Sequence, residues 1–355
     1  MLAVTQGPRL WAALSRALRL QQALDEAAQA VDQAVGWDKL PTPLGLLTLV
    51  GVRHILRARN LADTTPAPPT TPPAPDARPL TQRTVDGTFN DLGCPVMGSA
   101  GMRFGRNVPR EYTFPEDDAG ILSPNPRTIS RELLTRDTFQ PATTLNILAA
   151  AWLQFQIRDW FSHGKNQKEN PWQVPLADED PWPEHPMRIL RTAPDPTRGP
   201  ADDGTPATHI NTETHWWDAS QIYGSTPDFQ AKARTGTDGK LVIGRDHLVD
   251  IGPEALVQQA GLAGWWVGQS LMFTLFTLEH NAICDRLKAA YPEWPDDELF
   301  AHARLVNAAL IAKIHTVEWT TAILGHPTMQ IAMRVNWWGI LGERIHNLLG
   351  RVSGS

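Results

Sequence analysis

Residues 143–162 read TTLNILAAAWLQFQIRDWFS, and this stretch decides the class of fold. An apolar run of this length favours a helix over a strand. Helices are also predicted over 8–36, over about 254–293, and over 296–324, where a proline followed by three acidic residues forms a good helix start. The chain therefore carries long helical segments at several places.

Signals for strands are sparse in comparison. The best is the short KLVIG at 240–244, and the proline-containing residues 164–212 are expected to form loops. The sequence thus predicts a mainly α-helical fold with few short strands.

The domain organisation follows from composition. Residues 63–79 contain seven prolines, which favour an extended tether and exclude a helix or sheet interior. We therefore expect N-terminal amphipathic helices at 1–62, a proline-rich linker at 63–82, and a main domain at 83–355. An ordered but irregular arm is expected at 84–111, since that segment is rich in Gly, Pro and Asn.

Charge and cysteine content exclude several classes of protein. The net charge of −6 argues against a dedicated nucleic-acid binder. Two cysteines, Cys94 and Cys284, cannot build a disulfide framework or a cysteine-type zinc site.

No apolar run is long enough to span a membrane, and arginines interrupt the N-terminal apolar pattern, so no signal peptide is expected. These features predict a cytoplasmic or peripheral membrane protein. The basic residues Arg53, Arg57 and Arg59 follow the apolar run at 40–52. The N-terminal helices are thus expected either to lie on a membrane surface or to pack on their own domain.

The predicted helix at 143–162 contains one acidic residue, Asp159, that is expected to be buried. It stands between apolar neighbours, and burying an unpaired carboxylate is costly. Either a bound cation or an arginine would compensate the charge of this carboxylate.

Residues 214–225, THWWDASQIYGS, offer ligands for such a cation. Thr214, Trp216, Asp218 and Ser220 alternate, so in an extended backbone they point the same way. Their hydroxyl, carboxylate and backbone carbonyl oxygens are the hard ligands that calcium prefers.

Together, these segments resemble the haem peroxidase and cyclooxygenase superfamily, and most closely its fatty-acid α-dioxygenases. The resemblance spans most of the chain and depends on many motifs in order, which read WDKLPTPLGLLTL, TVDGTFND, FGRNVP, AAWLQFQIRDW, HWWDASQIYGS, EHNAICDRL, ARLVNAALIAKIHTVEWT and MRVNWWGILG. The chain looks like the N-terminal part of such a protein, somewhat over half of it. The resemblance implies the helical haem peroxidase fold, present in part.

The resemblance also implies two cofactors, haem b and calcium. It assigns structural calcium to five ligands, which are Asp159, Thr214, Trp216, Asp218 and Ser220.

The family's distal haem helix carries a glutamine and, four residues later, a histidine. Here these positions are Gln154 and Arg158. Arginine is always charged and cannot act as a general base, although it can stabilise a developing negative charge. His163 is a weaker substitute, because five residues turn an ideal helix by about 140° from Arg158.

The α-dioxygenases hold the fatty-acid carboxylate with a histidine and a threonine five residues apart. His315 and Thr320 match them. On a straight helix these side chains would diverge by about 140°, so the assignment requires a distorted helix or a substrate lying between two faces. The alternative is that His315 is a core histidine.

The family's proximal haem ligand is a histidine three residues after a tyrosine that forms the catalytic radical. The tyrosines here are Tyr112, Tyr223 and Tyr291, and none is followed by a histidine at that spacing. His326 and His346 remain as other candidates for iron ligation.

The resemblance implies a haem-dependent oxidoreductase that adds O₂ at C2 of a fatty acid through a tyrosyl radical, or a peroxidase that uses peroxide. Three alternatives stay open. The chain could be a non-catalytic relative, a half-domain that needs a partner chain to supply the proximal half, or a membrane-surface binding module. A missing half would leave apolar patches exposed, for instance around Trp337 and Trp338.

Overall fold

The structure, a computed structural model, describes residues 7–59, 74–105, 120, 122–164, 166–249, 266–339 and 341–349. The chain divides into two compact units, which are described one at a time. Unit 1 contains the described residues up to 59 and those from Lys313 onward. Unit 2 contains the described residues between 74 and 312. The predicted proline-rich linker lies largely outside the described residues.

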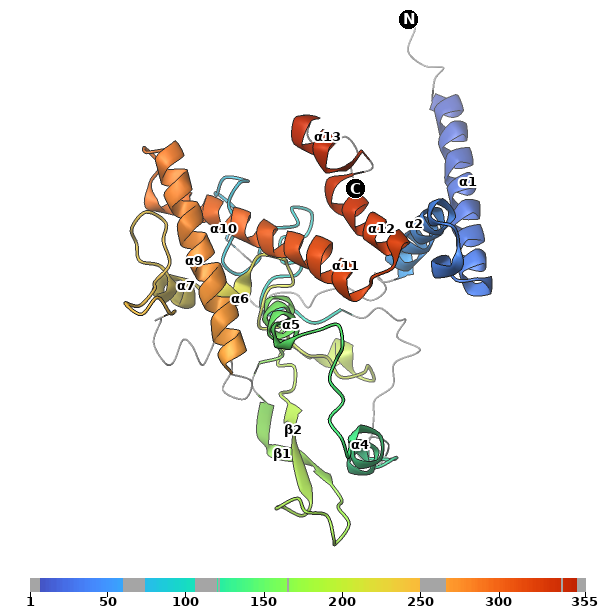
Figure 1. The fold of residues 1–355 in the computed structure, drawn as a ribbon, viewed down its shortest axis with the longest axis vertical. Coiled ribbons are helices and arrows are strands. Elements are labelled where there is room, and N and C mark those ends of the chain that lie inside the picture. The colour runs from blue at the N-terminus through green and yellow to red at the C-terminus, as the bar shows by residue number, and fades with distance from the viewer. Residues whose placement is uncertain are drawn as a thin grey trace, which may run out of the picture. The chain divides into compact units, whose positions relative to one another are not determined.

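The fold is mainly α-helical, as the sequence predicts (Figure 1). The helices of unit 2 are α4 (Pro126–Leu134), α5 (Ile147–Trp160), α6 (Ser220–Tyr223), α7 (Pro227–Ala233), α9 (Val267–Ala290) and α10 (Asp296–Lys313), with a short 3₁₀-helix η3 (Pro200–Asp202). Three of them, α5, α9 and α10, coincide with the strongest helical predictions, although residues 250–265 of the predicted helix at 254–293 lie outside the described part.

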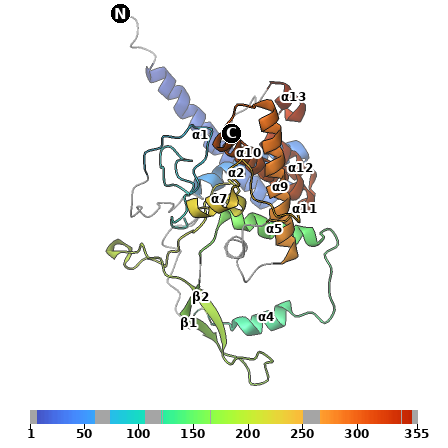
Figure 2. The same ribbon diagram turned by 90° about the vertical axis from the view of Figure 1, so that its left-hand side faces the viewer.

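The expectation that residues 164–212 form loops was wrong in part. They contain an antiparallel hairpin, visible beside α4 in Figures 1 and 2, made of β1 (Asn166–Val174) and β2 (Met187–Thr192). Pro171 lies where the strand register shifts between Gln167 and Trp172, so its missing N–H interrupts no regular ladder. A proline in a strand is tolerated at such an irregularity.

The predicted strand at 240–244 is also wrong. Leu241 makes only an isolated bridge to Arg234. Its backbone N–H donates to Asn281 Oδ1 at 2.8 Å, and its carbonyl accepts from Asn281 Nδ2 at 3.0 Å. Because a side chain of α9 satisfies both groups, this segment pairs with no second strand.

The core of unit 2 forms where α5 packs on α9. The rings of Phe155 and Phe276 stack with centroids 5.2 Å apart, and Phe273 meets Phe155 edge-on at 5.5 Å. Gln269 Nε2 donates to the carbonyl of Ala151 at 3.2 Å. This contact fixes α5 against α9.

Unit 1 contains α1 (Gly7–Ala34), the 3₁₀-helix η1 (Trp37–Lys39), α2 (Thr42–Arg59), the π-helix η5 (Ile314–Trp319), α11 (Thr320–Ile323), α12 (Pro327–Trp338) and α13 (Gly342–Leu349). Helices therefore occupy the N-terminal segment, and α1 packs on α2 through small residues. A Cβ atom added at Gly51 would collide with the methyl group of Ala28.

The expected exposed patch around Trp337 and Trp338 is not observed. Both side chains are half-buried, and the ammonium group of Lys313 lies 5.8 Å from the ring centroid of Trp338. The strongly exposed apolar residues at this end are Leu348 and Leu349, because α13 buries none of its residues.

Candidate functional site

The site begins with α5, which places Asp159 on its buried face. The side chain of Asn146 caps the helix by accepting a hydrogen bond from the Leu148 N–H at 3.0 Å. The helix ends at Trp160, so Asp159 stands in the last turn, where it is 1% exposed. The sequence therefore delivers a carboxylate into the core of unit 2.

Three of the four other predicted calcium ligands form hydrogen bonds with this carboxylate or with that of Asp218 nearby, or carry the latter. The Ser220 N–H donates to Asp159 Oδ1 at 2.7 Å, and the Ser220 hydroxyl donates to the same oxygen at 3.1 Å. The Thr214 hydroxyl donates to Asp218 Oδ1 at 2.8 Å. We call Asp159, Thr214, Asp218 and Ser220 the oxygen cluster; none of them is more than 2% exposed.

Trp216, the fifth predicted ligand, shapes the loop of the oxygen cluster. Its carbonyl accepts a hydrogen bond from the Asp218 N–H at 2.8 Å, and its indole Nε1 donates to the Met97 carbonyl at 3.0 Å. Gly98, with a φ of 66°, allows this approach, since an added Cβ would lie 3.0 Å from that indole nitrogen. The role of the Trp216 carbonyl as a ligand stays a prediction.

The two carboxylates of the oxygen cluster differ in their electrostatic surroundings. Burial, and then the nearby charge of Asp218, raise the pKa of Asp159 well above its usual value. The guanidinium of Arg304 lies 3.2 Å from Asp218 Oδ2, and Arg83 adds a weaker attraction. Among the described residues, Asp159 forms no ion pair of its own.

The residues present fit calcium. Two buried carboxylates and two hydroxyls converge, and a divalent ion would neutralise the repulsion between the carboxylates. Over the described part of the chain, no group of three or more His, Cys, Asp or Glu side chains could hold a metal, so hydroxyl and carbonyl oxygens would complete the shell. The ion would act structurally, joining the loop to α5.

Arg304 was not anticipated as part of this site. It is 2% exposed on the buried face of α10, where its Nη1 also donates to the Thr84 carbonyl at 3.1 Å. The signal was present, because an arginine interrupts the apolar stripe that runs through Leu299, Ala303 and Ile311. The arginine expected as an alternative partner for Asp159 in fact pairs with Asp218.

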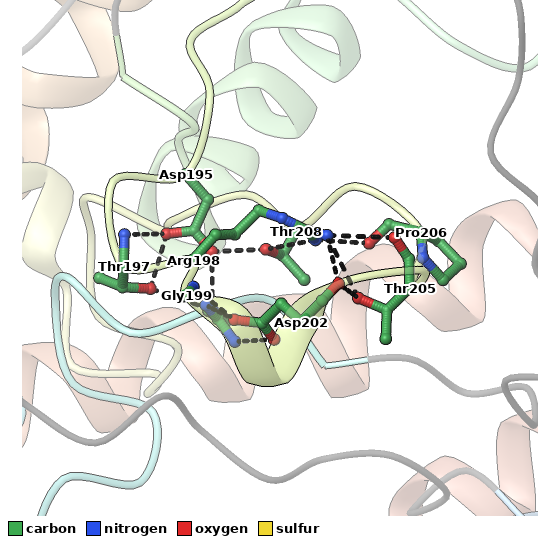
Figure 3. Close-up of polar contacts among 9 residues, drawn as sticks. Asp195, Thr197, Arg198, Gly199, Asp202, Thr205, Pro206 and Thr208 are labelled. Carbon is green, nitrogen blue, oxygen red and sulfur yellow. Dashed lines mark hydrogen bonds and ion pairs between the residues drawn. The ribbon is translucent and has the colours of Figure 1, made fainter.

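A second polar network holds the chain that leads into the oxygen cluster (Figure 3). Arg103 Nε donates to Asp195 at 2.6 Å, and its two terminal nitrogens donate to both oxygens of Asp202 at 3.0 and 2.9 Å. Thr197 and Thr208 also donate to Asp195. Burial alone would raise the pKa of Asp195, but these hydrogen bonds outweigh it and hold that pKa at about 2.

This network continues to α5 through Asn211. The N–H of Asn211 donates to the Met102 carbonyl at 2.8 Å. Its side-chain oxygen accepts from the Ser162 N–H at 2.8 Å, just beyond the end of α5. Asn211 therefore fixes the start of the loop at 211–220 relative to Asp159.

The two predicted distal residues lie on α5. Gln154 Oε1 accepts a hydrogen bond from Trp266 Nε1 at 2.7 Å. Burial lowers the pKa of Arg158, and the carboxylate of Glu213 opposes that shift. Burial raises the pKa of Glu213, whose Oε2 accepts from the Ser225 hydroxyl at 2.5 Å. Their catalytic roles stay predictions.

A buried tyrosine and histidine, which were not singled out from the sequence, join α6, α9 and α10. His280 Nε2 lies 2.9 Å from the Gly239 carbonyl and must donate to it, so Nδ1 accepts from the Tyr223 hydroxyl at 2.8 Å. Asn307 Nδ2 donates to the same hydroxyl at 2.9 Å. Burial lowers the pKa of His280 to about 4, and it is held neutral.

His315 and Thr320, the predicted substrate residues, belong to unit 1. The helix is distorted between them into the π-helix η5, which is one of the two arrangements that would allow the carboxylate assignment. Their role in substrate binding stays a prediction. In a π-helix residue i+5 follows residue i by about one turn, and such segments often occur at functional sites. The Thr320 hydroxyl donates to the His315 carbonyl at 2.8 Å, and the imidazole of His315 stacks on Trp319 at 6.4 Å. Burial lowers the pKa of His315.

The structure describes the surroundings of three other histidines, and a role of any of them in iron ligation stays a prediction. His326 Nδ1 accepts from the Thr328 N–H at 3.2 Å, and its Nε2 lies 2.9 Å from the Asp38 carbonyl, so both ring nitrogens are engaged. His163 is exposed beyond the end of α5. His346 Nδ1 contacts Asn347 Oδ1 at 3.4 Å.

Calcium uptake is expected to release protons. The raised pKa of Asp159 means that the metal-free protein keeps a proton on this carboxylate at pH values where a metal-bound carboxylate has lost it. Calcium affinity should therefore rise with pH above about 4. Calorimetric titration in two buffers of different ionisation enthalpy measures the protons released. Equal apparent enthalpies in both buffers would contradict the shift.

The helical fold and the oxygen cluster define a class of protein that comparison with known families identifies. Residues 82–352 match the family described as Animal haem peroxidase, and the chain belongs to this family. It is 36% identical to the alpha-dioxygenase PIOX of Oryza sativa over 327 residues, and 36% identical to alpha-dioxygenase 1 of Arabidopsis thaliana over 328 residues. Both matches cover 92% of this chain.

Solved structures of α-dioxygenases are also similar to this chain. The crystal structure of the Oryza sativa fatty acid alpha-dioxygenase superposes with a TM-score of 0.79 at 34% identity, and covers 94% of this chain and 54% of that one. The Arabidopsis thaliana enzyme also gives 0.79, at 33% identity, over 95% and 51% of the two chains. The chain spans about half the length of the relatives it matches.

Proposed function

We propose that this chain is the N-terminal, calcium-binding part of a haem-dependent fatty-acid α-dioxygenase or peroxidase-type oxidoreductase. The oxygen cluster supports this proposal most directly. It is formed by the residues that the family resemblance assigns to calcium, in a chain 36% identical to an alpha-dioxygenase. The ion would keep the loop at 214–220 attached to α5, and so would fix the register of Gln154 and Arg158.

Haem b, when bound, would supply the oxidising chemistry of this family. No histidine follows a tyrosine by three residues in this sequence, so no axial ligand is assigned and no reaction step is derived through haem. The chain's own contribution is Arg158. Its guanidinium stays charged near neutral pH, so it would stabilise developing negative charge beside α5 without accepting a proton.

The substrates we propose are a fatty acid together with O₂ or peroxide. A structure of the Oryza sativa enzyme contains palmitic acid. In this chain the π-helix η5 carries His315 and ends directly before Thr320, and this arrangement supports binding of the fatty-acid carboxylate there. A neutral imidazole can donate a hydrogen bond to a carboxylate from one ring nitrogen.

Fusing this chain to the part of the Oryza sativa alpha-dioxygenase that it does not match tests the activity. With haem, calcium and palmitic acid, the fusion is expected to consume oxygen and form a 2-hydroperoxide, whereas the chain alone should not. A fusion that shows a haem Soret band and binds calcium, yet consumes no oxygen, would contradict the proposal. That result would favour a non-catalytic relative.

A second candidate function is peripheral membrane binding by the α1–α2 hairpin. Leu44, Leu47 and Val50 on α2 are 53%, 68% and 51% exposed, while the small residues Gly45 and Gly51 are buried. The hairpin thus turns large aliphatic side chains outward. Residues 1–59 carry seven Lys and Arg against four Asp and Glu, giving +3 where the whole chain is −6. Both features favour an anionic lipid surface. Among the described residues no helix is long and apolar enough to cross a bilayer.

Vesicle sedimentation tests this function. The chain is expected to sediment with vesicles containing phosphatidylserine, and Leu44→Glu with Leu47→Glu should reduce the bound fraction several-fold, because each buries a charge in lipid. Leu80→Glu, at an exposed site in unit 2, is the matched control. Equal sedimentation of all three proteins would exclude the hairpin as the membrane contact.

A further inference from the structure

We propose that the arm at residues 84–105 forms one wall of the calcium site, so that docking of the arm and binding of calcium favour each other. The arm is the described part of the irregular segment predicted at 84–111. It supplies none of the predicted ligands, and the proposal therefore adds positioning residues to the site. The proposal rests on calcium binding by the oxygen cluster, which is part of the proposed function.

The second half of the arm is paired with the loop that carries the ligands. Arg103 and Ile210 form an isolated antiparallel bridge, and backbone hydrogen bonds continue this pairing on both sides of it. They run from the Phe104 N–H to the His209 carbonyl at 3.0 Å, from the Gly101 N–H to the Asn211 carbonyl at 2.6 Å, and from the His215 N–H to the Gly98 carbonyl at 2.8 Å. The ligand loop thus obtains its position from a segment that is distant along the chain.

The first half of the arm lies against a predicted ligand. Gly87 is buried with a φ of 80°, and a Cβ added there would stand 2.8 Å from Cγ2 of Thr214. This methyl group and the Thr214 hydroxyl share one carbon, so displacing the methyl would also move the hydroxyl that donates to Asp218. The two halves of the arm are joined, because the Ala100 N–H donates to the Asp86 carbonyl at 2.8 Å. Docking of the whole arm therefore restricts the side chain of one predicted ligand.

Arg304 links the arm to the second carboxylate of the oxygen cluster. Its Nη1 donates to the Thr84 carbonyl at 3.1 Å, its Nη2 to Asp218 Oδ2 at 3.2 Å, and its Nε to the Asp218 carbonyl at 3.3 Å. The guanidinium is planar and 2% exposed, so it holds the arm and Asp218 in a fixed relation with little competition from water. Arg304 is a positioning residue, because it holds a ligand and would not itself bind the ion.

One charge opposes the coupling. Burial lowers the pKa of Arg83, which directly precedes the arm, and the charges of Asp218 and Asp159 counteract this shift. Bound calcium would repel this guanidinium. Among the described residues no ion pair joins Arg83 to either carboxylate, and its Nη1 donates to Asn90 Oδ1 at 3.2 Å. Coulomb repulsion falls with distance, whereas the arm touches the ligand loop directly, so we expect these contacts to decide the sign of the coupling.

The coupling has a thermodynamic origin in the freedom of the ligand loop. A loop fixed on α5 by an ion loses less freedom when the arm pairs with it, and a loop held by the arm loses less when the ion binds. Such coupling is reciprocal, so each event strengthens the other by the same factor. A measurement in either direction therefore tests it.

Replacing Gly87 with alanine tests the effect of the arm on calcium. Gly87→Ala is expected to weaken calcium binding by the whole chain about tenfold, as measured by calorimetric titration, although no ligand is changed. Gly101→Ala is the matched control, because Gly101 has a φ of 86° in the same arm and an added Cβ would meet nothing within 4 Å. Equal affinities in all three proteins, or an equal loss in both variants, would overturn the proposal.

Hydrogen exchange tests the effect of calcium on the arm. Adding calcium to the chelator-treated chain should slow exchange in peptides covering residues 97–104 about tenfold, and by less in Gly87→Ala. The β1–β2 hairpin belongs to the same unit and contains no predicted ligand, so its exchange should not change. Slower exchange at 214–220 without any change in the arm would refute the coupling.

Trp216→Phe is a second variant that keeps the test decisive if thermal melting shows that Gly87→Ala does not fold. It retains the backbone carbonyl predicted to bind the ion and removes the indole N–H that donates to the Met97 carbonyl. Protection of the arm by calcium should fall several-fold in this variant. Undiminished protection would count decisively against the proposal.

Failure of this proposal and failure of the proposed function give different results. An unchanged chain that binds no calcium would contradict the calcium assignment and the coupling together. A chain that binds calcium without protecting the arm would contradict the coupling alone. Neither measurement requires haem or turnover, so an inactive fusion protein would leave the coupling intact.

Discussion

Replacing Asp218 with alanine is expected to lower the free energy of unfolding by ~3–5 kcal/mol, which is the cost of leaving a buried charge without its partner. Asp218 is fully buried and Arg304 is 2% exposed, with 3.2 Å between the paired atoms. The variant should also lose the calcium-dependent part of its stability, because one of two carboxylates is gone. Urea denaturation with and without calcium measures both effects.

Two further variants separate the metal from the ion pair. Asp178→Ala removes an exposed aspartate and should leave the urea midpoint and its calcium response unchanged. Adding Arg304→Leu to Asp218→Ala should recover part of the stability, because the uncompensated charge is removed, but it should not restore the calcium response. An Asp218→Ala protein that keeps both its midpoint and its calcium response would refute the assignment.

Stability is expected to fall as the pH drops from about 6.5 to about 4, mainly through His280. Burial lowers its pKa from 6.5 to about 4, and the hydrogen bond to the Gly239 carbonyl opposes this shift. Between these values the unfolded chain binds a proton that the folded chain does not, so acid favours unfolding. A difference of this size corresponds to stability on the order of 3 kcal/mol, present above about pH 6.5 and lost by about pH 4.

Urea midpoints measured across this range with saturating calcium give the slope. Calcium bound at the proposed site would keep Asp159 ionised, so the opposite pH dependence of Asp159 would not interfere. His280→Gln should remove much of the dependence of the urea midpoint on pH. Some of it should remain, because burial also lowers the pKa values of His215 and His315. The exposed His163→Gln control should keep the full slope. An unchanged slope in the His280 variant would show that another group carries the dependence.

Long helices were the most predictable part of the fold. The helix at α5 was evident from an apolar run, and the start of α10 from Pro295 and the acids after it, because caps and periodicity are local properties. The β1–β2 hairpin was missed for the opposite reason. Its strand contains a proline and depends on a shift of register with a partner strand, which no local pattern encodes.

The candidate site was predictable to a similar extent. Alternating oxygen ligands at 214–220 and a carboxylate at position 159 are visible in the sequence, and the structure joins Asp159 to Ser220 at 2.7 Å. Arg304 was not found, because its partner lies 86 residues away along the chain. The neutral state of His280 was not predicted either, since it depends on burial among residues that are distant along the chain.

The sequence by itself determined where the longest helices form, which residues can supply hard oxygens, and to which family the chain is related. Only the tertiary structure decided that Asp218 forms an ion pair with an arginine, whereas Asp159 forms none among the described residues, and that the helix carrying His315 winds as a π-helix. The physical reason is distance along the chain. Helix formation and ligand chemistry depend on near neighbours, whereas the charge state of a buried group depends on residues that only folding brings within a few ångströms.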